Sequence, residues 1–278
     1  DPGKALIRYA EAIEEEGVFD EVARIAWQKA DSRWKKYGDR PIPTSYGYTI
    51  LLDSGERQTE KVKQLEADLL AMVPGGEATI LDKKRASLTE EEQRLLEADL
   101  AELDTEDYQT ALQAKSKLLV TPEDMVEAVA PEDRNTARVT ASKLVEARAY
   151  ETTIRRYRDV VNYVYWKTRC EVEQQDRAIE GRQFLYEANE AFEDIRLVES
   201  IEKYDEAWER WSSIHRDYQV LADDVTAEDL VDAIKRYHGL LDQLGQPFAG
   251  RISHAPSNGQ LCRPVPGYWC GQVGANGG

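Results

Sequence analysis

Apolar residues recur every three or four positions from Lys4 to Leu244, with charged residues between them. This is the period of helices that bury one face and expose the other, and it differs from the alternation of strands. The pattern predicts an all-α fold, built of antiparallel helical hairpins packed as a bundle. The first two helices are expected over 4–16 and 19–37, as an antiparallel pair joined by a short loop.

Residues 41–55 interrupt the helical pattern. Apolar and polar residues alternate there for a few positions, as in a short strand, but no second strand is evident to pair with it, so we expect a packed loop. Helical spacing resumes over 62–72, and a second loop is expected after Pro74. Ser87 and Thr89 then each stand three residues before a glutamate, which is the spacing of a capping box at the start of a helix.

Two ten-residue segments, beginning at Val120 and Val225, are identical at six positions. In each segment a threonine that can cap a helix precedes two acidic residues, which favour the positive end of the helix dipole. Two explanations stay open: an internal duplication, or capping chemistry shared by two unrelated helices.

The longest periodic run, over 132–173, has the alternating three-and-four spacing of a heptad seam. Two more helices are expected over 177–194 and 197–218, and their short connections predict that the three pack as antiparallel neighbours. A last helix is expected over 226–244. We therefore expect three regions, namely helices over 1–119 with a loop at 38–58, a long-helix bundle over 120–246, and an irregular Gly/Pro-rich tail over 247–278.

Small and aromatic residues in the predicted bundle fall at the spacing of a known helical hairpin. Phe184 and Ala188 take the aromatic and small positions of a first helix, and Ser200, Tyr204 and Ala207 take the matching positions of a second. On these positions, residues 181–214 resemble a tetratricopeptide repeat (TPR), a helix-turn-helix unit of about 34 residues. The resemblance implies a TPR-like protein that binds other proteins without catalysis. The charged, aromatic-rich C-terminal helices are also similar to those of uncharacterised bacterial envelope proteins.

The chain is acidic, with 36 Lys and Arg residues against 53 Asp and Glu residues and a net charge of −17. Such a surface repels phosphate backbones and anionic membranes, so other protein subunits are expected as partners, and nucleic acid is not. No apolar run approaches the ~18 residues of a membrane helix. Residue 1 is Asp1 and not Met, so either an N-terminal segment was removed or the sequence is a fragment. Membrane association is expected only through an anchor in such a missing segment.

The three cysteines are the sequence evidence for the cellular compartment of the protein. Cys170 lies in a helical stretch, where a buried structural thiol is expected. Cys262 and Cys270 flank a Pro-Gly turn signal in the tail, where a disulfide and two free thiols are open alternatives; zinc ranks behind both because CxxC partners are missing. Since a disulfide persists only in an oxidising compartment, we expect an extracytoplasmic, periplasmic location, with the cytoplasm as the alternative.

Known motifs of catalysis and metal binding do not occur in the sequence. The residues three before His215, His238 and His254 are not glutamates, which excludes the Glu-x-x-His pairs of di-iron bundles. No zinc-protease, P-loop, haem or EF-hand motif is present. We therefore assign no catalytic residue, metal or cofactor, although carboxylates alone can perform acid–base catalysis. The acidic runs 14–16 and 90–92 are interpreted as solvated helix ends rather than calcium ligands.

Aromatic side chains are the remaining candidates for binding. Those on the helix at 197–218 form one stripe, which is either core or a partner-binding surface, and His215 on this stripe is expected to belong to the core. The candidate partner-binding residues are Tyr204, Trp208, Trp211, Tyr268 and Trp269.

Three functional hypotheses follow from these observations. The first is a non-catalytic scaffold or protein-interaction subunit of a larger, envelope-associated assembly. The second is a carboxylate enzyme with its site between helices, assisted by a tyrosine or by His215. The third is an extracytoplasmic ligand-sensing domain.

Overall fold

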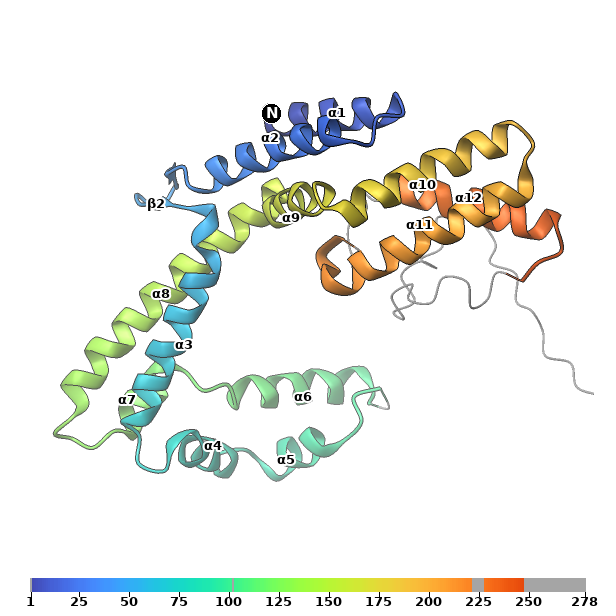
Figure 1. The fold of residues 1–278 in the computed structure, drawn as a ribbon. Coiled ribbons are helices and arrows are strands. Elements are labelled where there is room, and N and C mark those ends of the chain that lie inside the picture. The colour runs from blue at the N-terminus through green and yellow to red at the C-terminus, as the bar shows by residue number, and fades with distance from the viewer. Residues whose placement is uncertain (1, 102, 222–227, 248–278) are drawn as a thin grey trace, which may run out of the picture. The chain divides into compact units, whose positions relative to one another are not determined.

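The computed structural model describes residues 2–101, 103–221 and 228–247 (Figure 1). Within these residues the chain forms twelve α-helices and two strands of two residues each. The prediction of an all-α fold is confirmed. Contacts divide the described residues into two compact units: those within 1–38 and 158–278 form unit 1, and those within 39–157 form unit 2.

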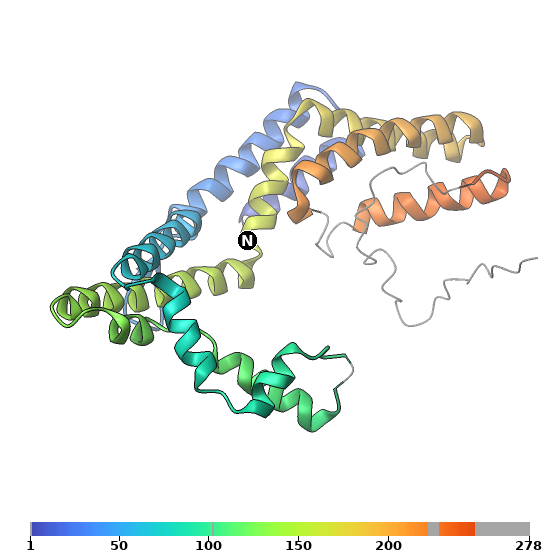
Figure 2. The same ribbon diagram turned by 90° about the horizontal axis from the view of Figure 1, so that it is seen from below.

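Unit 1 is built from two helical hairpins and two further helices. Helices α1 and α2 form one hairpin, which packs on α9, and α10 and α11 form a second hairpin, against which α12 lies (Figure 1, Figure 2). The elements are α1 (Pro2–Glu15), α2 (Glu21–Gly38), α9 (Tyr163–Glu173), α10 (Asp176–Glu193), α11 (Leu197–Asp217), the 3-10 turn η2 (Gln219–Leu221) and α12 (Glu228–Gln243).

Small residues allow the helices of unit 1 to approach closely. A Cβ atom placed on Gly3 would lie 3.0 Å from the Trp34 ring, so glycine is what lets α1 meet α2 there. In the second hairpin, Ser200 is fully buried, and its Oγ donates a 2.8 Å hydrogen bond to the carbonyl oxygen of Ala188. Ala188 and Ser200 are two of the small positions expected for residues 181–214. The tetratricopeptide identity of the hairpin stays a prediction.

Aromatic rings fill much of the core of unit 1. Trp27 and Trp34 of α2, Tyr163 of α9, Tyr204 of α11 and Tyr237 of α12 are its largest fully buried side chains. Rings meet across helices: those of Trp34 and Trp166, for example, stack 6.4 Å apart. Burial of such large rings is the main apolar contribution to the stability of this unit.

Unit 2 has an aliphatic core. Val62 and Leu69 of α3 pack with Met125 of α7 and with Ala137 and Leu144 of α8. Its elements are β1 (Ile42–Pro43), β2 (Thr49–Ile50), the 3-10 turn η1 (Leu52–Ser54), α3 (Gly55–Ala71), α4 (Gly76–Ala86), α5 (Glu90–Glu97), α6 (Thr105–Lys117), α7 (Pro122–Ala128) and α8 (Arg134–Val161), the last of which extends four residues beyond the unit.

Side-chain caps begin three helices of unit 2. Thr89 starts α5 and Thr121 starts α7, each in a capping box with the acidic residue three positions on. The Asp104 carboxylate accepts from two backbone N–H groups at the start of α6. Each cap satisfies N–H groups that have no partner inside the helix. The capping box predicted at Thr89 and the cap predicted at Thr121 are thus observed. The box predicted at Ser87 is wrong, because Ser87 ends α4 and its Oγ donates to the carbonyl oxygen of Lys84 instead.

Two loops expected in unit 2 contain regular structure. The alternating segment does find a partner, because β1 and β2 pair antiparallel with Ile42 opposite Ile50. The loop expected after Pro74 is largely helix α4. Ile80 is its one buried apolar residue, so α4 lacks the repeated apolar stripe by which an amphipathic helix is recognised.

The predicted single long helix over 132–173 is wrong. It breaks at Asn162, which has φ 50°, between α8 and α9. Asparagine is among the few residues that adopt this left-handed conformation readily. The expectation of three antiparallel neighbours fails with it: α10 and α11 are such neighbours, whereas α9 packs on α2 much more than on α10.

The division into units also differs from the expected regions at 1–119 and 120–246, because α1 and α2 pack with helices from the other end of the chain. The expected tail at 247–278 lies outside the described residues except for its first position. Among the helices of the described residues, none combines the length and apolar character needed to cross a bilayer.

Candidate functional site

The aromatic stripe of α11 lies in the core of unit 1. Tyr204, Trp208 and Trp211 are 0%, 4% and 3% exposed. The rings of Tyr204 and Trp208 stack 6.3 Å apart, and both contact Tyr237 of α12. Of the two alternatives for this stripe, core and partner surface, the structure therefore places it in the core. The other candidates, Tyr268, Trp269, Cys262 and Cys270, lie outside the described residues.

Two further residues considered in the sequence, His215 and Cys170, lie wholly or partly buried in unit 1. His215 is half-buried beside the Trp211 ring, and burial lowers its pKa. Cys170 is fully buried, as predicted, and burial raises the pKa of its thiol to about 12. A thiol with such a pKa stays protonated and unreactive. In the described part of the chain, no group of His, Cys, Asp and Glu side chains is arranged to hold a metal ion.

Five charged side chains from α1, α9 and α10 meet inside unit 1, and we call them the ionic cluster. The Arg182 guanidinium pairs in bidentate fashion with the Glu173 carboxylate, at 2.5 and 3.2 Å. Arg169 lies between two glutamates, with its Nη2 2.7 Å from Glu11 Oε1 and its Nε 3.6 Å from Glu173 Oε1. The members are Glu11, Glu14, Arg169, Glu173 and Arg182.

Glu14 is the least compensated member of the ionic cluster. It is 7% exposed, and its Oε1 accepts a 2.7 Å hydrogen bond from the indole N–H of Trp27. Burial and the negative charge of Glu173 raise the pKa of Glu14 to about 7. Burial acts on Glu173 in the same direction, but the charges and hydrogen bonds of Arg182 and Arg169 outweigh it and lower the pKa of Glu173.

The two pKa shifts together set the charge of the ionic cluster. With Glu14 protonated, the negative charges of Glu11 and Glu173 balance the positive charges of Arg169 and Arg182. Ionisation of Glu14 leaves one uncompensated negative charge in a buried place, which is costly. Glu14 and Glu173 are 7% and 2% exposed, so both side chains are almost closed to solvent and solutes in this arrangement. The ionic cluster therefore links α1, α2, α9 and α10 through buried ion pairs and hydrogen bonds.

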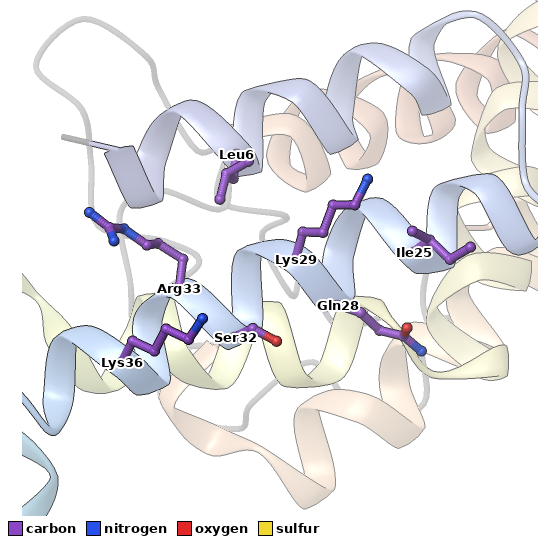
Figure 3. A pocket seen from close by; sticks show the side chains of 7 residues that line it. All are labelled: Leu6, Ile25, Gln28, Lys29, Ser32, Arg33 and Lys36. Carbon is purple, nitrogen blue, oxygen red and sulfur yellow. The ribbon is translucent and has the colours of Figure 1, made fainter.

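A separate feature lies on the outside of the α1–α2 hairpin. It is an open hollow of about 450 Å³ (Figure 3), which we call the α2 hollow. Leu6 of α1 lines one side, and six residues of α2 line the other. The α2 residues are Ile25, Gln28, Lys29, Ser32, Arg33 and Lys36.

The three cations of the α2 hollow have no acidic partner in the described part of the chain. Lys29, Arg33 and Lys36 are exposed and form none of the ion pairs there. The other basic residues of α2 do form pairs: Arg24 with Glu21 and Asp176, and Lys35 with Asp31. In a chain with a net charge of −17, three neighbouring unpaired cations are an unusual concentration of positive charge.

Neither feature was predicted from the sequence, although signals for both exist there. The interpretation of residues 14–16 as a solvated helix end is wrong for Glu14, which follows Ile7 and Ala10 at helical spacing and shares their buried face. In α2, positions 25, 29, 32 and 36 repeat at alternating four and three, beside the buried stripe. Because these positions are mostly polar, a search for apolar periodicity passes over them.

No protein-family model, curated protein or solved structure matches this chain.

Proposed function

We propose that this chain is a non-catalytic helical scaffold or protein-interaction subunit of a larger, envelope-associated assembly, with other protein subunits and not nucleic acid as its partners. The observation that carries the proposal is the turn between α10 and α11. Ile195 and Val198, at this turn, are 80% and 65% exposed. Large exposed apolar side chains on the tip of a hairpin are suited to burial against a partner.

The backbone at this turn supports the same proposal. Ile195 has φ 62°, in the left-handed region that a β-branched residue adopts only at a cost. The turn is held by hydrogen bonds from the N–H of Ile195 to Phe192 O at 3.0 Å and from the N–H of Arg196 to Ala191 O at 2.8 Å. This is the position at which helices commonly end in glycine. An isoleucine that is both strained and exposed contributes little to folding, and a partner contact accounts for its presence.

The test compares two matched double variants of the full chain. The complex is isolated from native extract, and its mass and composition are measured by native mass spectrometry. Ile195→Asn with Val198→Ser is expected to release the partner, because asparagine tolerates the left-handed conformation but removes the apolar contact. The control, Leu119→Asn with Val139→Ser, changes two residues of unit 2 that are 68% and 56% exposed and should retain the partner. Recovery of monomer alone from the unmodified chain at micromolar concentration contradicts the proposal.

A carboxylate enzyme is the second candidate, and one observation favours it. The pKa of Glu14, raised to about 7, suits a general acid or base near neutral pH. The burial of Glu14 at 7% exposure favours the first proposal instead. Glu14→Gln separates the two functions, since it abolishes acid–base catalysis and leaves partner binding by the α10–α11 turn intact.

The extracytoplasmic location is a further part of the proposal, and it depends on Cys262 and Cys270. A disulfide between them requires an oxidising compartment. Mass spectrometry of native protein prepared without reductant is expected to find the tail peptide about two daltons lighter than its reduced form. A fully reduced tail contradicts this location.

A further inference from the structure

We propose that the α2 hollow is a docking site for an acidic amphipathic helix of a partner protein. This inference rests on the proposed function, because it names the chemistry of one partner of the scaffold. It uses a surface that does not include the α10–α11 turn. The two surfaces are therefore separable by variants.

The positive charge of the α2 hollow indicates an anionic occupant. Lys29, Arg33 and Lys36 follow one another along α2 with no acidic partner among the described residues. At a rise of 1.5 Å per residue, their backbone positions span about 10 Å. Unpaired cations at this density attract and orient an anionic group. The occupant therefore carries several negative charges within about two turns of helix.

The apolar residues select among anionic partners. Leu6 lines the hollow from α1, and Ile25, which is 41% exposed, lies at the end of the cationic row (Figure 3). An occupant that covers these side chains has an apolar group beside its acidic ones. Bare phosphate chains lack such a group, and an extended nucleic acid or anionic bilayer would also meet the repulsion of a chain with net charge −17. A short acidic peptide has few negative charges outside the α2 hollow, so it meets less of this repulsion.

The spacing of the lining residues favours a helix as the form of that peptide. Ile25, Lys29, Ser32 and Lys36 are separated by four, three and four residues, so they form one stripe along the side of α2. A partner helix whose side chains repeat at the same spacing meets such a stripe along its length. The matching partner has a leucine that reaches Ile25, followed by glutamates that face Lys29, Arg33 and Lys36.

The experiment measures the affinity of the full chain for a synthetic helix. The probe is a fluorescein-labelled amphipathic peptide with a leucine and three glutamates at this spacing, and binding is followed by fluorescence anisotropy. We expect binding that weakens as salt is added. Lys29→Glu with Arg33→Glu is expected to weaken it about tenfold or more, because like charges then face each other across the contact.

The control is a charge reversal of the same kind elsewhere. Arg138→Glu with Lys143→Glu replaces one arginine and one lysine on the exposed surface of α8, neither of which forms a described ion pair, and changes the net charge equally. Its affinity for the probe should stay within about twofold of the original chain. A peptide with lysines in place of the glutamates should bind the Lys29→Glu, Arg33→Glu chain better than the original chain. This charge exchange shows that the reversed chain is folded.

Three results would overturn the inference. The first is equal affinity of the probe for the original chain and the Lys29→Glu, Arg33→Glu chain. The second is binding of vesicles with anionic lipid, but not of the probe. The third is a dimer of the chain, detected by sedimentation, that the same reversal dissociates, because the occupant is then a second copy. If native complexes form and depend on Ile195 while the probe results fail, the inference falls and the proposed function stands.

Discussion

Units 1 and 2 are both helical, but different side chains hold them together. Unit 1 buries large aromatic rings and the ionic cluster, whereas residues 39–157 contain no Trp, Phe, His or Cys. The core of unit 2 is aliphatic. An ion pair between its long helices, Arg148 with Glu66 at 2.8 Å, is more than a third exposed on both sides. Charged groups thus form a network in the interior of unit 1, whereas the ion pair between the long helices of unit 2 stays at the surface.

This difference implies different responses to mutation and pH. Removing one member of a buried ion pair leaves an uncompensated charge, while removing an exposed member leaves a group that water solvates. Unit 1 should therefore respond strongly to changes in the ionic cluster. Tryptophan fluorescence reports on unit 1 selectively, because all six tryptophans lie outside residues 39–157.

The largest effect is expected from Arg182→Ala. It leaves Glu173, which is 2% exposed, without its bidentate partner, and the loss of unfolding free energy should be ~3–5 kcal/mol. Denaturant titration followed by tryptophan fluorescence measures it. The matched change in unit 2, Arg148→Ala, should cost less than about 1 kcal/mol by circular dichroism. Equal losses from the two variants would remove the contrast between the units.

The next effect concerns pH. The pKa of Glu14 is about 7 in the folded chain against an ordinary value of 4.5, so its protonated form stabilises unit 1. That contribution is complete below pH 4.5 and is lost as the pH rises through 7. The loss should approach ~3 kcal/mol by alkaline pH, as a pKa unit corresponds to about 1.4 kcal/mol.

Glu14→Gln tests this pH dependence, because glutamine stays neutral at every pH. Unfolding titrations at acid and alkaline pH should show a much smaller difference in stability for the variant than for the original chain. Glu15→Gln, on the exposed face of the same helix, serves as the control and should keep the original dependence. The lowered pKa of Glu173 acts oppositely, since its contribution is present above the unfolded-state value and is lost as the pH falls.

A smaller effect is expected in unit 2 from Thr121→Ala. The variant removes the side chain that caps α7 and accepts from the N–H of Asp124 at 3.2 Å, at a cost of ~1 kcal/mol. Far-UV circular dichroism should show the loss, with little change in the tryptophan transition. Thr110→Ala, inside α6 and half-buried, should change stability by less than about 0.5 kcal/mol. A cap effect transmitted equally to the tryptophan signal would mean that the units unfold together.

The smallest effect is a gain in stability. Ile195→Gly relieves the left-handed strain at φ 62° and loses little burial, because the side chain is 80% exposed. Set against the greater freedom of glycine in the unfolded chain, the net gain should be about 0.5 kcal/mol. Val198→Gly, at a helical position in α11, should instead destabilise by ~1 kcal/mol. Thermal unfolding of both variants measures the difference, and a loss from Ile195→Gly contradicts the strain argument.

The helices were predictable where their signals are local. Caps such as those at Thr89 and Thr121 are complete within four residues, so the sequence contains the whole interaction. The break at Asn162 was missed because the apolar rhythm continues across it, and the backbone conformation there has no periodic signature. Helix α4 was missed because one buried residue, Ile80, does not make a period.

The sites were harder to predict because they depend on distant pairs. Glu14 and Glu173 come together only when α1 packs near α9 and α10, and no spacing along the chain specifies that meeting. The cations that line the α2 hollow are distinguished by the lack of acidic partners among the described residues. Which charges are paired depends on the folded structure and is not visible in the sequence. The aromatic stripe of α11 was recognised correctly as a stripe, and the coordinates were needed to place it in the core.

The Cys170 thiol on α9 is fully buried, and its pKa of about 12 keeps it protonated. An alkylating reagent therefore modifies it only in molecules that have transiently opened. In a chain whose two tail cysteines are replaced by serine, the modification rate measures how often this part of unit 1 opens under native conditions. The alkylation rate of the native Cys170 thiol thus measures local opening of unit 1 without an engineered label.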